Sequence, residues 1–217
     1  MSRDPSGSSW PVVHVVDDDA GVRKGLCRLL EAAGYTARPH ASAGDFLLEA
    51  PFEAPACVLL DVRMPGPSGL ELQEALVGRG EDLPIVFLSG HGDIPMAVRA
   101  LKLGAVDFLT KPVKREKLLA AVAAALAHGA ERRQEREELR TLRERYETLT
   151  PREREVLALV VSGRLNKQIA GEIGAAERTV KAHRANAMEK LGADSLADLV
   201  RIASRLGVPK PPSEEAP

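Results

Sequence analysis

Five short apolar runs, separated by amphipathic helical stretches, occupy the first 127 residues of the chain. These runs are typical of β-strands and lie at residues 12–16, 35–40, 56–60, 85–88 and 106–109. Their alternation with helical stretches predicts an α/β domain with a parallel sheet. Runs 56–60 and 85–88 are apolar on both faces, so we expect them at the centre of the sheet, covered by helices on both sides. Run 35–40 is less apolar and is expected at an edge.

The chain has room for a second domain. A length of 217 residues is long for one compact domain and short for three. The content of 44% apolar and 28% charged residues is typical of an ordinary globular protein. No apolar run approaches the roughly 20 residues of a membrane-spanning helix, and the N-terminal residues lack the layout of a signal peptide. We therefore expect a cytoplasmic protein without a membrane partner.

Cysteine usage and charge add weaker constraints. Cys27 and Cys57 lie in helical and apolar patterns, so we expect buried thiols rather than a disulfide or a metal site. Residues 11–128 carry a net charge of −3, whereas residues 150–207 carry +3. A basic excess of this size fits a nucleic-acid partner only if a motif supports it.

A polar helix is predicted between the two regions. Residues 131–147 contain neither Gly nor Pro and hold six Arg and six Glu, which is typical of a solvated helix with i,i+4 ion pairs. Its apolar residues share one helical stripe, made of Leu139, Leu142, Tyr146 and Leu149. Two interpretations stay open, a helical linker over residues 129–148 and a short dimerising coiled coil that continues the preceding helix.

A helix start signal opens the second domain, which we place at residues 149–207. Thr150 is a suitable N-cap, Pro151 suits the first helical position and Glu153 completes a capping box. The region is expected to be all-helical, with turns at Gly163, near Gly174 and at Gly192. Residues 1–10 and 208–217 are expected to be disordered tails.

Acidic side chains stand where the predicted strands end. Asp17, Asp18 and Asp19 follow the first run, and Asp61 follows the third run directly. In a doubly wound sheet the functional crevice lies beyond the carboxyl ends of the strands, so these carboxylates would converge if the two strands are neighbours. Such a cluster needs a hard cation, and carboxylates with waters suit Mg²⁺. The Asp triplet alone also fits a helix N-cap.

A hydroxyl and an ammonium group are placed at the same edge of the sheet. Ser89 ends the fourth run, and Lys111 follows the fifth. A carboxylate nucleophile, metal-binding carboxylates, and a Ser and a Lys that hold transferred oxygens together predict phosphoryl transfer.

Four segments that carry these residues resemble the motifs of a response-regulator receiver domain, most closely of the FixJ type. They are VVDDD at residues 15–19, LLDVRMPGPSG at 59–69, LSGHGDIPMA at 88–97 and GAVDFLTKP at 104–112. The similarity covers nearly all of residues 12–127. It implies a flavodoxin-like receiver domain over residues 11–128, with a five-stranded parallel sheet in the order 2-1-3-4-5.

The resemblance also implies roles for the acidic residues. Asp61 would accept a phosphoryl group from a sensor histidine kinase. The cofactor would be Mg²⁺, held by Asp17, Asp18, Asp61 and the backbone carbonyl of Arg63. Arg63 and His91, beside the site, would tune the lifetime of the phosphoryl group.

Further roles follow from the resemblance for the other strand ends. Ser89 would bond to the phosphoryl group, Lys111 would pair with it, and Phe108 would shift with Ser89 to report phosphorylation. The peptide bond between Lys111 and Pro112 would be cis, which is accessible because its second residue is proline.

A helix-turn-helix pattern lies in the second domain. Residues 166–173, a tight turn through Gly174 and a helix over 177–191 have the spacing of this motif. Its apolar seam is Ile169, Ala170, Ile173, Val180 and Leu191. Opposite the seam we expect donors for phosphates and base edges, namely Arg178, Thr179, Lys181, His183, Arg184 and Asn186. The pattern alone also fits a helical hairpin with a solvated basic face.

Three segments of this domain are similar to the LuxR/FixJ-type output domain over residues 149–205. They are LTPREREVL at 149–157, NKQIA at 166–170 and RTVKAHR at 178–184. The similarity implies DNA contacts, with Lys181 and Arg184 facing the major groove, Thr179 and His183 near phosphates, and Asn166 and Lys167 on the DNA backbone. Gly171 departs from the commoner Ala and should cost roughly 1 kcal/mol of helix stability.

The two resemblances together predict a DNA-binding response regulator of a two-component system, not an enzyme. Phosphorylation of Asp61 would expose a dimer surface on the fourth helix, fifth strand and fifth helix, and so promote binding to promoter DNA, with RNA polymerase as a further partner. Two alternatives stay open. One is a phosphorylation-independent transcription factor with a degenerate receiver. The other is a Mg²⁺-dependent phosphohydrolase, which would need an acid or base two residues after Asp61, where Arg63 stands.

Overall fold

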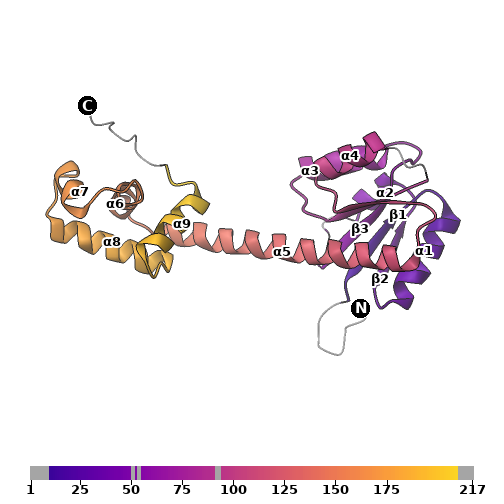
Figure 1. The fold of residues 1–217 in the computed structure, drawn as a ribbon, viewed down its shortest axis with the longest axis horizontal. Coiled ribbons are helices and arrows are strands. Elements are labelled where there is room, and N and C mark those ends of the chain that lie inside the picture. Colours follow the sequence, from indigo (N-terminus) through magenta and orange to yellow (C-terminus); the bar gives the residue numbers. More distant parts are fainter. Residues whose placement is uncertain (1–9, 50–51, 53–54, 91–93, 210–217) are drawn as a thin grey trace. The chain divides into compact units, whose positions relative to one another are not determined.

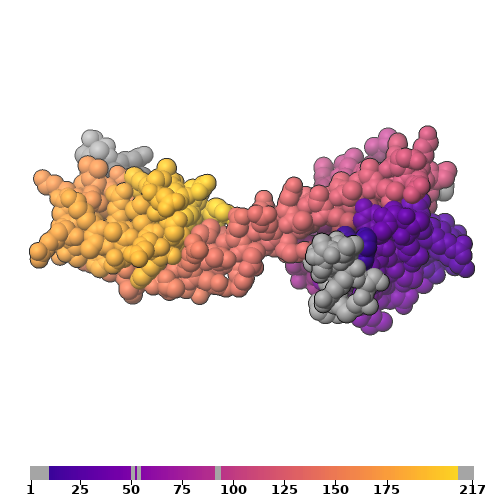
Figure 2. Space-filling view, turned by 90° about the horizontal axis from the view of Figure 1, so that it is seen from below, coloured from indigo at the N-terminus to yellow at the C-terminus, as the bar shows by residue number. Residues whose placement is uncertain are grey.

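The computed structural model describes residues 10–49, 52, 55–90 and 94–209. The chain divides into two compact units, which we call the α/β unit (residues 1–133) and the helical unit (residues 134–217). The long helix α5, Arg115–Glu147, contributes to both of them. Figure 2 shows the closely packed surface of each unit, coloured along the sequence.

The α/β unit contains a five-stranded parallel sheet. Its strands are β1 Val12–Val16, β2 Thr36–His40, β3 Ala56–Asp61, β4 Ile85–Ser89 and β5 Asp107–Thr110. They are hydrogen-bonded in the order β2-β1-β3-β4-β5, so the predicted fold class and strand order are confirmed. As expected, β3 and β4 are interior strands and β2 lies at an edge. Because β1 and β3 are neighbours, the acidic residues after β1 and at the end of β3 share one edge of the sheet.

Helices cover both faces of this sheet (Figure 1). Helices α2 Ala43–Leu47, α3 Gly69–Gly78 and α4 Ile94–Lys102 pack on one face, where Phe46 and Phe87 are fully buried. Helix α1 Ala20–Ala32 and the first part of α5 pack on the other face, where Leu30 and Leu118 are fully buried. Burial on both sides explains why the central strands are apolar throughout.

Helix α3 approaches the end of β3 unusually closely. Ser68 caps the helix, and Glu71 completes a capping box with it. A Cβ atom on Gly69 would lie 2.2 Å from the backbone oxygen of Asp61, a distance at which the backbone must shift. Glycine at this position therefore allows α3 to pack directly against the strand end that carries Asp61.

The helical unit is built from the end of α5 and four further helices, α6 Pro151–Val161, α7 Asn166–Glu172, α8 Glu177–Leu191 and α9 Leu196–Leu206. The predicted start of α6 is confirmed, because Thr150 and Glu153 form a reciprocal capping box. The predicted turns are confirmed as well. Gly163, Gly174 and Gly192 all have positive φ, at 89°, 64° and 68°.

The apolar stripe of α5 packs within the helical unit. Leu149 is buried in the core of this unit, and Leu142 and Tyr146 pack against that core. The Arg154 guanidinium lies 5.1 Å from the centre of the Tyr146 ring. This stripe therefore buries apolar surface inside a single chain, and the dimerising coiled coil stays a prediction.

Three smaller expectations concern the tails, the cysteines and the membrane. Most of the predicted tails lies outside the described residues, but Trp10 lies over Gly34, and Val208 packs on the helical core. Cys27 and Cys57 are free and buried as predicted, and burial raises the pKa of the Cys57 thiol to about 12. None of the helices in the described part of the chain has the length and hydropathy needed to cross a bilayer.

Candidate functional site

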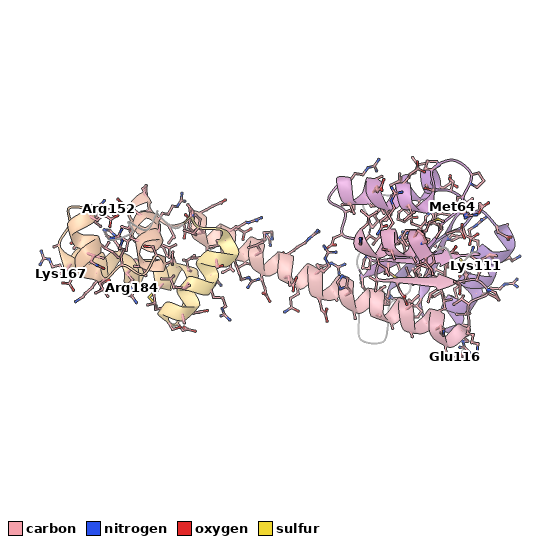
Figure 3. All side chains as sticks on the ribbon, turned by 45° about the horizontal axis from the view of Figure 1, so that its top comes forward. Met64, Lys111, Glu116, Arg152, Lys167 and Arg184 are labelled. Carbon is pink, nitrogen blue, oxygen red and sulfur yellow. The ribbon has the colours of Figure 1, made fainter. Side chains whose placement is uncertain are left out.

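Two buried carboxylates meet one ammonium group at the carboxyl edge of the sheet. Asp17 follows β1, and Asp61 ends β3; they are 1% and 7% exposed. Lys111, which follows β5, places its Nζ 2.6 Å from Asp17 Oδ2 and also donates a hydrogen bond to Asp61 Oδ1. The structure thus brings together three predicted site residues that lie 94 and 50 positions apart in the chain. Figure 3 labels Lys111 at this position.

The three consecutive aspartates have three different environments. Asp17 is in the buried pocket, where its Oδ1 accepts a hydrogen bond from the backbone N–H of Asp19 at 2.9 Å. Asp19 is the N-cap of α1, because its Oδ1 accepts hydrogen bonds from the backbone N–H groups of Gly21 and Val22. Asp18 between them is exposed. The N-cap interpretation is therefore confirmed for Asp19, while Asp17 enters the pocket and its role as a metal ligand stays a prediction.

The electrostatics of the pocket set Asp61 apart from an ordinary surface carboxylate. Burial raises the pKa of Asp61, although the hydrogen bond from Lys111 and the 2.7 Å bond from the backbone N–H of Arg63 act in the opposite direction. The nearby Asp17 carboxylate raises it further. Burial alone would lower the pKa of Lys111, but its hydrogen bonds to both carboxylates raise that pKa above its ordinary value. A perturbed carboxylate of this kind in a strand-end pocket is a functional-site candidate.

Ser89 and Phe108 lie on the neighbouring strands. Ser89 ends β4 and is 2% exposed, and its carbonyl accepts a 2.7 Å hydrogen bond from the backbone N–H of Lys111. Phe108 on β5 is half-buried, with its ring centre 6.2 Å from that of Phe87. The peptide bond between Lys111 and Pro112 is cis, as the resemblance implied.

Not every predicted metal ligand joins the pocket. Within the described residues, the side chains of His14, His40 and Glu49 are the only group of three His, Cys, Asp or Glu residues whose ligand atoms lie within 4.8 Å of one another. The Asp18 carboxylate therefore does not converge in this way with those of Asp17 and Asp61. His91, predicted to tune the phosphoryl lifetime, lies outside the described residues.

The histidine and glutamate group was not anticipated from the sequence. Its members lie on two strands and just beyond a helix, and His14 to His40 alone spans 26 positions. No motif spacing joins them, and only the pairing of β1 with β2 brings the histidines together.

The second candidate site is the surface of α7 and α8. Val180, Ala187 and Leu191 form the buried side of α8. The predicted DNA contacts on α8 divide into two rows, because successive residues are turned by about 100°. Lys181 and Arg184 form one row and Thr179 and His183 the other. Of these four, Lys181 is exposed and the remaining three are half-buried. These four residues therefore flank the seam on both sides, whereas the other two predicted donors, Arg178 and Asn186, are exposed on the far side of α8.

The predicted backbone contacts lie at the start of α7. Lys167 is exposed, and Figure 3 labels it together with Arg184. Asn166 is half-buried, and its buried Oδ1 has no hydrogen-bond partner among the described residues. Lys181 is held by an ion pair with Glu177 at 3.1 Å. A basic side chain thus lies in the first turns of both helices of the motif, and an amide side chain at the start of α7.

The α/β unit has a parallel sheet with a carboxylate pocket at its edge, and the helical unit has a helix-turn-helix. This combination is that of a two-domain regulator with a receiver domain and a DNA-binding domain. Comparison with known families agrees with this assignment. The family of response regulator receiver domains matches residues 13–123, and the luxR family of bacterial regulatory proteins matches residues 147–203.

Individual relatives resemble the chain over nearly its whole length. It is 47% identical to the response regulator protein TodT of Pseudomonas putida over 195 residues. The matched region covers 90% of this chain and 86% of TodT. It is 45% identical over 197 residues to the transcriptional regulatory protein FixJ of Azorhizobium caulinodans, which covers 90% and 93%. The structure of the response regulator StyR superposes with a TM-score of 0.75 at 49% identity, covering 91% of this chain and 100% of that one.

The chain therefore belongs to the FixJ-type response regulators, which join a receiver domain to a LuxR-family DNA-binding domain. It is a transcriptional regulator, whose receiver domain implies a histidine kinase partner and whose output domain implies DNA binding.

Proposed function

We propose that Asp61 accepts a phosphoryl group from a sensor histidine kinase, and that phosphorylation controls promoter binding by the helical unit. The observation that carries this proposal is the convergence of Asp17, Asp61 and Lys111 in one buried pocket. We assign the protein no enzymatic turnover. We place it in the cytoplasm, because that is where a regulator meets promoter DNA.

The chemistry uses the groups of this pocket. An Asp61 carboxylate oxygen attacks the phosphorus of the kinase phosphohistidine, so that an O–P bond forms while the N–P bond breaks and the imidazole leaves. The Lys111 ammonium then pairs with the new phosphoryl oxygens, and the Ser89 hydroxyl donates a hydrogen bond to them. Lys111 is already in place for this role, because it contacts the acceptor carboxylate.

The donor set of the pocket fits Mg²⁺. Its buried carboxylates, Asp17 and Asp61, already share one cationic group, and all the proposed ligands are oxygens. Asp17 and Asp61 would hold the ion together with the carbonyl of Arg63, and the exposed Asp18 would have to turn inward to join them. When bound, Mg²⁺ neutralises the negative charge that builds up during transfer.

A signal path to the helical unit begins at Ser89 and Phe108. A phosphoryl group adds negative charge and acceptor oxygens, which draw Ser89 inward and repack Phe108. Helix α4, next to β5, exposes apolar side chains, with Ile94, Val98 and Leu101 being 75%, 45% and 47% exposed. We propose that α4, β5 and α5 form the dimer surface, which pairs two helical units on a near-palindromic site and presents them to RNA polymerase.

Acetyl phosphate labelling tests the acceptor. Mixing the full chain with acetyl phosphate and Mg²⁺ is expected to add one phosphoryl group, detected by intact mass. The Asp61→Asn variant is expected to gain none, while the control Asp194→Asn, at an exposed aspartate of the helical unit, labels like the parent. Labelling of Asp61→Asn would show a different acceptor. Equal DNA affinity of the phosphorylated and the unphosphorylated protein would support the phosphorylation-independent alternative.

Sedimentation and DNA binding test the output. Beryllofluoride is expected to convert monomers into dimers, and an unchanged mass would contradict the dimer surface. On duplexes selected from a random-sequence pool, Lys181→Ala is expected to weaken binding by about tenfold or more, as removal of a base contact does. The matched control is Lys24→Ala, an exposed lysine on α1.

A further inference from the structure

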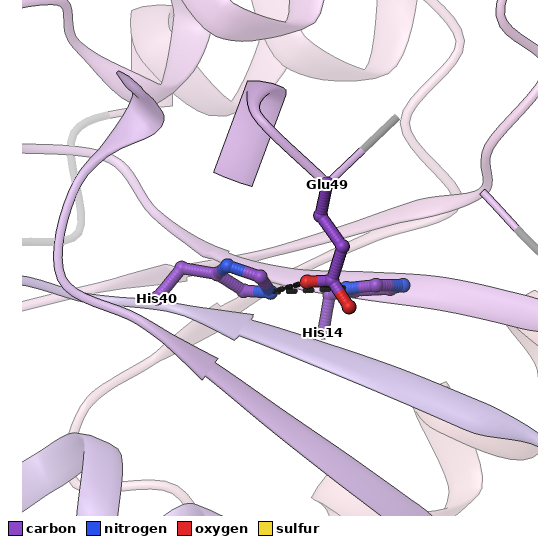
Figure 4. A group of neighbouring side chains, drawn as sticks. All are labelled: His14, His40 and Glu49. Atoms are coloured by element: carbon purple, nitrogen blue, oxygen red, sulfur yellow. Dashed lines mark hydrogen bonds and ion pairs between the residues drawn. The ribbon is translucent and has the colours of Figure 1, made fainter. Parts of the chain in front are cut away.

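Three potential ligand atoms converge on one face of the sheet, at the edge where β1 pairs with β2. His14 Nδ1 lies 3.0 Å from His40 Nε2, and Glu49 Oε2 lies 3.1 Å from His40 Nε2 and 3.8 Å from His14 Nδ1. Figure 4 shows the carboxylate placed between the two rings. The group is separate from the proposed phosphorylation pocket and has no role in the chemistry described above.

The fold fixes all three side chains. His14 pairs in register with Arg38, and His40 pairs with Val16, so both histidines project from the same face of adjacent strands. Glu49 lies just beyond α2, and its other carboxylate oxygen is hydrogen-bonded to Arg38. That ion pair leaves Oε2 directed at the histidines. The Arg38 contact thus orients this carboxylate as an outer partner orients a metal ligand.

The spacing of the three atoms matches the coordination sphere of one small ion. Zn²⁺ binds imidazole nitrogens and carboxylate oxygens at about 2.0–2.2 Å in tetrahedral geometry, which places neighbouring ligand atoms about 3.3 Å apart. The separations of 3.0, 3.1 and 3.8 Å average close to that value, and the point equidistant from the three atoms lies about 2 Å from each of them. By distance, one ion can therefore lie within bonding range of all three atoms.

Without an ion, His14 Nδ1 and His40 Nε2 share one hydrogen bond, and Glu49 Oε2 lies within 4 Å of both nitrogens. At most one proton can lie between the two ring nitrogens, while the carboxylate oxygen faces the same point. Both rings are buried, and a low-dielectric environment favours the neutral imidazole with a free lone pair. Neutral imidazole is the form that binds metal ions.

The surroundings are suited to a rigid site. His14 and His40 are 1% and 6% exposed, and the Phe46 ring packs edge-on against both. Phe52 packs edge-on against His14 and stacks on Phe46 at 4.5 Å. Glu49 is 30% exposed, so the group has a solvent side, from which a water would complete a tetrahedral coordination sphere.

We propose that His14, His40 and Glu49 form a binding site for one divalent transition-metal ion of the Zn²⁺ class in the α/β unit. The site is also connected to the phosphorylation pocket through the backbone, since the carbonyl of His40 accepts a 3.2 Å hydrogen bond from the N–H of Asp17. Two imidazoles and one carboxylate select such ions over Mg²⁺, which favours oxygen ligands.

Calorimetric titration of the full chain with Zn²⁺ tests the site. The protein is first stripped with EDTA and then held in excess Mg²⁺, which competes for all-oxygen sites. The expected result is one Zn²⁺ per chain, bound at least about tenfold more weakly by His40→Gln and by Glu49→Gln, because loss of even an outer partner of a ligand costs that much. His128→Gln, which changes an exposed histidine of the same unit, is expected to bind like the parent.

Co²⁺ provides a second readout that reports ligand type. A tetrahedral site with two nitrogens gives Co²⁺ an intense visible absorption, expected in the parent and in His128→Gln and absent in His40→Gln. Because Glu49 is partly exposed, Glu49→Gln is expected to keep the native circular dichroism. Equal Zn²⁺ affinity in the parent and in a natively folded Glu49→Gln variant, or no saturable binding by the parent, overturns the proposal.

Discussion

Each unit of this protein contains a buried pairing between a lysine and carboxylates, and the two pairings differ in the direction of the carboxylate pKa. In the helical unit, Lys190 lies 2.7 Å from Glu153, whose side chain is only 4% exposed. The hydrogen bond from Lys190 and the backbone N–H of Thr150 hold the pKa of Glu153 below its ordinary value. In the α/β unit, burial instead raises the pKa of Asp61 despite its contact with Lys111.

The difference separates a pairing whose charge is compensated from one with surplus negative charge. Glu153 is one carboxylate with one cation and a helix start, so its charge is compensated where it lies. Asp61 and Asp17 both contact the Lys111 ammonium group, so two carboxylates share one cation. A pocket in which two carboxylates share one ammonium group favours the uptake of a further cation, whereas the charge of Glu153 is compensated within the helical unit.

The largest effect is expected from Gly69→Ala, which tests whether the pocket depends on close backbone packing. The added methyl group meets the backbone oxygen of Asp61 at 2.2 Å, so the end of β3 must move. We expect a loss of about 3 kcal/mol in the free energy of unfolding, typical of overpacking, together with slower acetyl phosphate labelling. Urea denaturation and labelling rates measure both. Unchanged values in both assays would mean that the strand end tolerates displacement.

Glu153→Gln is expected to destabilise the protein by about 2 kcal/mol, because Gln keeps the capping box but loses the charge-assisted bond to Lys190. The difference from the parent should be present at neutral pH and should vanish as the pH falls below about 4.5, since a carboxyl group with a lowered native pKa stabilises only while ionised. Denaturation series across this pH range provide the measurement. Arg201→Gln, in an exposed i,i+3 pair, serves as the control and should change stability by less than about 0.5 kcal/mol.

Asp61→Asn is expected to have the opposite effect to Glu153→Gln. The free energy of unfolding at neutral pH should be maintained or raised by up to about 1 kcal/mol, which is the net contribution of a typical hydrogen bond. The native pKa of Asp61 is raised, so its ionisation destabilises the folded state as the pH rises above about 3.8, and the variant removes this penalty. Thermal unfolding at pH 3 to 7 in EDTA tests the sign. A variant less stable than its parent at neutral pH would place Asp61 in the structural class with Glu153.

The smallest effect is expected from Gly171→Ala in α7. Unlike Gly69, this glycine is exposed, and a Cβ atom there meets nothing within 4 Å. Alanine should therefore raise the free energy of unfolding by about 0.5–1 kcal/mol through helix propensity alone. Chemical denaturation measures both this variant and Gly69→Ala. The two form a matched pair, because the same Gly→Ala substitution is expected to stabilise the protein at one position and destabilise it at the other. A destabilised Gly171→Ala would indicate that the motif requires flexibility in α7.

Much of the architecture was accessible from the sequence because it depends on near neighbours. The strand runs, the capping box of Thr150 and Glu153, and the turn glycines are set by hydrogen bonds and conformations within a few residues. The acidic motif around Asp61 was recognised for the same reason, since each part is a short contiguous segment. Prediction was weaker for α8, where His183 and Arg184 are half-buried instead of lying opposite the seam.

The sequence by itself determined which segments become strands and helices, where they start and which chemical groups stand at strand ends. Only the tertiary structure decided which aspartate of the triplet enters the pocket, that Gly69 must lack a side chain, and that His14 and His40 meet Glu49. The physical reason is that such contacts join residues tens of positions apart. Their distances are set by strand order and register, which emerge only when the whole sheet is packed.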